Sequence, residues 1–164
     1  MDFPYIVLVR ILVIMLKRYT FWLWTTSVLQ LLTAFIHALS FLFREPQPKN
    51  ESEQQLFDLL DHYQFDLGAG FHHSMGDMFS ALSASFSLLY LLGGLLTIYL
   101  LHKKIPQGIM KGVTGIQTLV FGISFLITFL LTFLPPIIMT CLVFISLSFA
   151  YATNHIHFIK LDEN

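Results

Sequence analysis

Three ionisable side chains lie within or beside long apolar runs of the sequence, where such groups are unusual. His37 comes near the end of the first run, and His73 and Asp77 come at the start of the second. An ionisable group at membrane depth is costly, so it usually has a partner or a function. Two consecutive antiparallel helices would bring the end of one run beside the start of the next, so we expect Asp77 to be the partner of His37. The three residues mark a candidate polar site.

Three kinds of chemistry are open to this site. A hydrogen bond between His37 and Asp77 would fix helix packing and do nothing more. The same residues could relay protons or hold the polar end of a ligand. His37, His73 and Asp77 are also weak metal or haem candidates, because the last two lie four residues apart on one helix face. The sequence contains no CxxC or HExxH pattern, so no specific motif indicates a cofactor.

Polar residues recur at helical spacing along the first two apolar runs. They are Thr26, Gln30, Thr33, His37 and Ser40 in the first run, and His73, Asp77, Ser80 and Ser87 in the second, where the small residue Ala84 keeps the spacing. Steps of three and four place these residues on one helix face, and in a membrane that face turns toward other helices. Gln30, Thr33 and Ser80 therefore join the candidate ligand-binding or proton-relay residues. Hydrogen bonding between helices is the alternative interpretation of the same stripes.

The elements that must position these residues follow from composition and from the length of the apolar runs. The chain has 164 residues, of which 55% are hydrophobic and 12% charged, and its mean hydropathy is +0.71. Helices over 19–43, 71–101, 109–133 and 136–154 would each cross an apolar layer of about 30 Å. The second includes an extension outside the membrane. We predict an all-α protein: an antiparallel bundle of four transmembrane helices that forms a single integral membrane domain over 1–164.

The remaining segments are predicted to lie at the membrane surface. Residues 3–16 are apolar but short, and basic residues follow them, so they read as an interfacial helix. The loop 44–70 contains two early prolines and then a short amphipathic helix over 53–65, which we expect at the outer end of the bundle. Residues 155–164 form a predicted cytoplasmic tail.

The distribution of basic residues predicts the orientation. One side carries Arg10, Lys17, Arg18, Lys103, Lys104, Lys111 and Lys160, and the other carries only Arg44 and Lys49. Basic residues concentrate on the cytoplasmic side of membrane proteins. Both termini are therefore predicted to be cytoplasmic, and the net charge of −1 gives no indication of a nucleic-acid partner.

Glycines recur along one face of the third predicted span. Gly108, Gly115 and Gly122 are spaced by seven residues, and Gly112 completes a small-xxx-small pair with the first. Small residues let helix backbones approach closely in membranes. This face is a candidate surface for a homo-oligomer, in addition to its contact with the lipid bilayer.

Two short motifs carry a resemblance. The second span opens with His73-Ser74-Met75-Gly76, preceded by Gly68, and the first ends near Ile36-His37-Ala38-Leu39. In these motifs the chain resembles an uncharacterised family of small four-helix bacterial inner-membrane proteins, which carry a histidine late in helix one and an HSxG motif before helix two. The resemblance implies a bacterial cytoplasmic membrane and emphasises His37 and His73. That family lends no known activity.

The sequence favours a non-catalytic protein that binds a small apolar or amphipathic ligand, or assists a partner, through a polar site at the outer end of the bundle. One alternative is a membrane redox protein linked to haem, a metal or a quinone. A second is a transporter or channel subunit that acts as an oligomer. The sequence contains no GxGxxG, P-loop or GxSxG motif, so nothing in it indicates a particular enzyme.

Overall fold

The computed structural model describes residues 18–39, 47–64, 68, 70 and 72–162, with side chains as far as Asn154. The helices in these ranges are α2 (Tyr19–Leu39), α3 (Glu51–His62), α4 (Met75–His102), α5 (Gln107–Leu131) and α6 (Leu134–Asp162). The predicted interfacial helix at 3–16 and the end of the first predicted span, 40–43, lie outside the described residues. So does the last predicted residue of the loop helix 53–65.

Four helices have the length and composition of membrane spans: α2, α4, α5 and the Leu134–Asn154 part of α6. Their surfaces are apolar, and Leu131 and Phe133 are 78% and 70% exposed. Among the described residues, more polar than apolar side chains are buried. A soluble protein has the opposite arrangement, whereas in a bilayer the apolar side chains face lipid and the polar ones pair inside. The prediction of an all-α protein with four spans is confirmed.

Capping residues explain where two helices begin. Asn50 accepts a hydrogen bond from the Glu53 N–H at 2.9 Å through its side chain. This N-cap starts α3 at Glu51, two residues before the predicted start. Ser74 caps α4 in the same way, so α4 begins at Met75 and not at the predicted residue 71.

The helix that contains the fourth span continues past the span. We predicted that residues 155–164 form a tail, but α6 remains helical as far as Asp162. The sequence after Pro136 contains no glycine or proline up to that point, so nothing in the backbone interrupts the helix. A cytoplasmic tail can be helical, so the end of the membrane span at 154 stays a prediction, and the candidate span in the structure is Leu134–Asn154.

The chain divides into two compact units. Unit 1 consists of Met1–Leu32 and Leu91–Asn164, and unit 2 of Thr33–Tyr90. The helices α2 and α4 contribute to both units.

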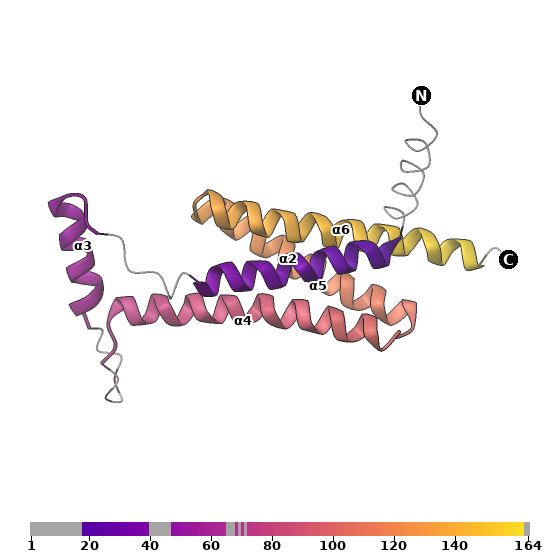
Figure 1. Cartoon of the computed structure of the whole chain (residues 1–164), viewed down its shortest axis with the longest axis horizontal. Coiled ribbons are helices and arrows are strands. Elements are labelled where there is room, and N and C mark those ends of the chain that lie inside the picture. The colour runs from indigo at the N-terminus through magenta and orange to yellow at the C-terminus, as the bar shows by residue number, and fades with distance from the viewer. Residues whose placement is uncertain (1–17, 40–46, 65–67, 69, 71, 163–164) are drawn as a thin grey trace, which may run out of the picture. The chain divides into compact units, whose positions relative to one another are not determined.

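Unit 1 is an antiparallel helical bundle joined by polar contacts. At one end of the α5 and α6 pair, Gln107 donates a hydrogen bond to Asn154 at 2.7 Å. At the other end, the hydroxyls of Thr128 and Thr140 are 2.8 Å apart. These contacts join the start of each helix to the far part of its neighbour, and Figure 1 shows α5 and α6 running side by side in opposite directions.

Glycines allow α4 to approach α2 closely within unit 1. A Cβ added at Gly94 would lie 3.0 Å from the side chain of Leu31 and 3.3 Å from the Ser27 carbonyl oxygen. A Cβ at Gly93 would lie 2.8 Å from Nε2 of Gln30. A side chain at either position would force Leu31 or Gln30 to shift, so the two glycines allow the helices to pack closely.

Unit 2 joins the amphipathic helix α3 to the start of α4. Tyr63 accepts a hydrogen bond from the Met75 N–H at 3.2 Å, and Gln64 and Ser74 form an isolated β-bridge. None of the α3 residues is buried. The apolar side chains Leu56 and Leu59 are exposed, so the described residues do not cover the apolar side of α3.

Candidate functional site

His37 lies in unit 2 near the end of α2, and its ring makes a polar contact with α4. The distance between Nε2 of His37 and Oγ of Ser83 is 3.0 Å. Both residues are partly buried. An imidazole nitrogen and a hydroxyl can each donate or accept, so this pair can present either polarity to a third group.

One aromatic ring lies beside His37, and a second ring packs against the first. The ring of His37 meets the ring of Phe86 edge-on, with 5.5 Å between centroids, and Phe86 in turn lies 4.9 Å from the fully buried ring of Tyr90. One turn before Tyr90, the Ser87 hydroxyl donates to the Ser83 carbonyl oxygen at 3.3 Å. A polar pair beside apolar rings suits an amphipathic molecule, because one part of the site can hydrogen-bond and the other can pack.

Asp77 has a different role from the one predicted. Its Oδ2 accepts from the Ser74 N–H and its own N–H donates to the Ser74 hydroxyl, both at 3.1 Å. This reciprocal pair is a capping box, which satisfies backbone donors at a helix start. Ser83 lies six residues further along α4, about 9 Å at the helical rise. The predicted pair of His37 with Asp77 is not formed, because Asp77 caps its own helix and His37 contacts Ser83.

His73 lies just before α4 and Ser80 lies in its second turn, and both are exposed. The nearest nitrogen of His73 is 3.9 Å from a carboxylate oxygen of Asp77, and both side chains are more than 60% exposed. Within the residues that the structure describes, no three His, Cys, Asp or Glu side chains come close enough to hold a metal ion. The candidates His37, His73 and Asp77 are thus not gathered into one ligand set.

The candidate Gln30 belongs to a buried network in unit 1. It is fully buried and donates to Oε1 of Gln117 at 3.4 Å, while Gln117 donates to the Thr97 hydroxyl at 3.0 Å. Oε1 of Gln30 has no hydrogen-bond partner in the described part of the chain. In the same unit Thr26 donates to Ser146 at 2.9 Å. These contacts join different helices, which is the interhelical bonding that the polar stripes also allowed.

The candidate Thr33 belongs to unit 2 and is 6% exposed. It lies one turn before His37 on α2, so it is on the side of the helix that carries the candidate site.

Two parts of the site were missed in the sequence. Ser83 and Phe86 lie one turn apart on α4, but a serine and a phenylalanine are ordinary in an apolar span and carry no signal of their own. The role of Asp77 could have been predicted from the sequence, because Ser74 and Asp77 fit the S-x-x-D pattern of a capping box just before an apolar run.

Comparison with protein families, with curated proteins and with solved structures gives no match for this chain. The class of protein follows from the fold: four long apolar helices with a polar interior define a multi-pass α-helical membrane protein.

Proposed function

We propose that this membrane protein is a non-catalytic binder of a small amphipathic molecule, or an accessory protein that presents such a molecule to a partner. The observation that carries the proposal is the contact of His37 with Ser83 beside the ring of Phe86. The polar end of the ligand would bond to the imidazole and hydroxyl, and its apolar part would pack on the aromatic ring. The partial burial of the pair leaves it within reach of such a molecule.

The surroundings of His37 favour binding over catalysis. In a nucleophilic site a histidine activates a serine and a carboxylate orients the histidine. Here the carboxylate of Asp77 is bonded to Ser74. Asp77 therefore does not orient His37 as the carboxylate of a catalytic triad would. Without such a carboxylate, Ser83 is a weak nucleophile.

The proposal includes a location and an orientation. We place the protein in a bacterial cytoplasmic membrane, following the resemblance of its His37 and His73 motifs. Both termini would face the cytoplasm, following the distribution of basic residues. The site at the end of α2 would then open toward the outer leaflet.

The test is a comparison of the molecules that purify with the protein. Wild type, His37→Ala and Ser83→Ala are purified in mild detergent, extracted with organic solvent and analysed by mass spectrometry. Ser85→Ala is the matched control, because its hydroxyl bonds to the Ala81 carbonyl oxygen of its own helix. We expect one molecular class to fall at least about fivefold in both site variants, which corresponds to the loss of one hydrogen bond. It should be unchanged in the control.

Two outcomes would contradict the proposal. Identical extracts from all four proteins would mean that no ligand binds at His37. A visible absorption band or a stoichiometric metal that is lost in His37→Ala would replace ligand binding with a redox function. Folding is monitored by size-exclusion chromatography and helical circular dichroism, so that a loss of ligand is distinguished from a loss of structure.

A further inference from the structure

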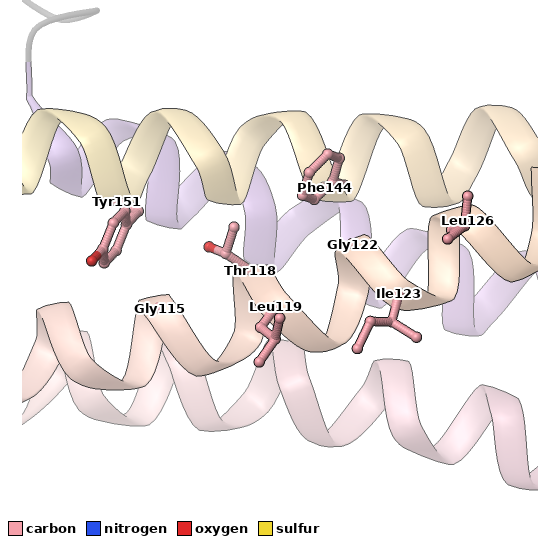
Figure 2. Close-up of a pocket in the computed structure, with 8 residues that line it drawn as sticks. All are labelled: Gly115, Thr118, Leu119, Gly122, Ile123, Leu126, Phe144 and Tyr151. Atoms are coloured by element: carbon pink, nitrogen blue, oxygen red, sulfur yellow. The ribbon is translucent and has the colours of Figure 1, made fainter.

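A long groove runs between α5 and α6 within unit 1. Its larger part has a volume of about 630 Å³ and its smaller part about 480 Å³, and the two share Gly115, Leu119 and Tyr151. Figure 2 shows the larger part, with Tyr151 and Phe144 extending from α6 and the small residues of α5 opposite them. The lining of the groove extends along α5 from Gly108 to Leu126, which is roughly 27 Å of helix.

The glycines along this groove fall into two sets. A Cβ at Gly115 would lie 3.1 Å from the ring of Tyr151, and one at Gly122 would lie 2.9 Å from the ring of Phe144. These two glycines accommodate aromatic rings of the same chain. By contrast, a Cβ at Gly108 or Gly112 would meet no atom within 4 Å. The predicted oligomer face is therefore partly occupied by the protein itself, and its open part lies at the start of α5.

The open part of the groove is next to positive charge. Lys111 lines it, and its ammonium lies 5.9 Å from the centroid of the Tyr151 ring. Lys103 and Lys104 lie in the turn just before α5, and the sequence contains no Asp or Glu from 78 to 161. The first turn of α5 has no acidic residue, and its N-cap, Pro106, makes no side-chain hydrogen bond. The positive end of the helix dipole thus adds to the charge of the lysines.

We propose that this groove binds an anionic phospholipid. One acyl chain would lie along the small residues between α5 and α6, and the phosphate would lie at Lys111 and the first turn of α5. The charge argues for this occupant, because phosphate binds at helix N-termini and to lysine ammonium groups. The dimensions agree, since the groove is longer than the half-thickness of about 15 Å that one leaflet provides.

A second copy of the chain fits this face less well. A two-fold dimer in a membrane contacts its partner through the same surface on both subunits. Two copies of Lys111 would then come to the same depth, close to each other and to both sets of neighbouring lysines. These like charges would repel each other, whereas a lipid phosphate would neutralise the positive charge of the lysines.

The test measures lipid selectivity by native mass spectrometry. The full chain in detergent is titrated with phosphatidylglycerol or with phosphatidylcholine of the same acyl chains. We expect wild type to bind the anionic lipid about fivefold more tightly, the effect of about one lysine at a membrane surface. Lys111→Gln should abolish most of the preference, and Lys111→Arg should retain it. Lys49→Gln removes the same charge in the loop before α3 and should have no effect.

Filling the groove is the second arm of the test. Gly112→Leu puts a side chain into open space, so the helix pair should remain folded while binding of both lipids weakens. Ala81→Leu adds the same bulk at an exposed position of α4 and serves as the control. Equal affinity for the two lipids in wild type would overturn the proposal. So would a dimer that Gly112→Leu dissociates with lipid selectivity unchanged, because the groove would then be an interface between copies of the chain.

Discussion

The two units differ in how deeply their hydrogen-bonded polar side chains are buried. In unit 1, Thr26 and Ser146 are both buried and bond to each other across two helices, and the fully buried Gln30 bonds to the half-buried Gln117. In unit 2, His37 and Ser83 are bonded to each other but remain partly exposed. Both pairs cross from one helix to another.

The accessibility of a polar pair therefore distinguishes helix packing from ligand binding, two roles that give the same pattern in the sequence. A polar pair without access to solvent or lipid can only hold helices together, at about 0.6 kcal/mol per hydrogen bond in membranes. A pair that remains within reach can also bind a third molecule. We expect substitutions in unit 1 to change stability and those at the site in unit 2 to change binding.

The largest effect is expected where α4 packs closely on α2 in unit 1. Gly94→Leu would force a side chain against Leu31 and the Ser27 carbonyl oxygen, and such overpacking costs about 1–3 kcal/mol. Its matched control is Ala84→Leu, at an exposed position of α4 in unit 2. Thermal denaturation in detergent should show a clearly lower Tm for Gly94→Leu alone. An equal Tm for the two variants would mean that unit 1 is no more tightly packed than the surface of unit 2.

A smaller effect is expected in the buried amide network. Gln117→Leu removes the contacts with both Gln30 and Thr97, and it should destabilise the protein by about 1 kcal/mol. Gln30→Leu removes one weak contact and an acceptor that has no partner in the described residues, so its cost should be smaller. Unfolding in a denaturing detergent measures both variants and the double variant. The reverse order would show that Gln30, and not Gln117, is the centre of the network.

The smallest effect is expected at the exposed start of α4. Asp77→Ala should increase hydrogen exchange in the first turn of the helix, with a cost of about 1 kcal/mol or less, because the capping box is lost. Asp77→Asn keeps a side-chain acceptor and should exchange almost as slowly as wild type. If Asp77→Asn lost the ligand while its hydrogen exchange stayed unchanged, Asp77 would belong to the binding site.

The number and position of the spans could be predicted because membrane helices depend on long apolar runs, which one sequence displays directly. Where the helices begin depends on single capping residues. Asn50 and Ser74 made α3 start earlier and α4 start later than expected. The apolar run shows where the fourth span lies, but it does not show that the helix continues to Asp162, because polar residues are compatible with a helix at a smaller cost than glycine or proline.

The candidate site was predicted in part. His37 was recognisable because a titratable group in an apolar span is rare, and it does face another helix. Its partner could not be predicted, since the rotation and register of two packed helices depend on contacts such as those of Gly93 and Gly94 with α2. A shift of one and a half turns along α4 separates the predicted partner, Asp77, from the observed one, Ser83.

The length of α6 has a mechanical consequence. Its 29 residues correspond to roughly 44 Å, above the apolar thickness of about 30 Å, and they still span roughly 34 Å at the largest usual tilt of about 40°. The helix is therefore longer than the apolar layer, and an end that stands outside the layer remains part of the same rigid rod. Such a rod transmits any rotation or axial shift of the span to the membrane surface without a flexible joint. A partner that held this end of α6 would be coupled directly to the packing of the bundle.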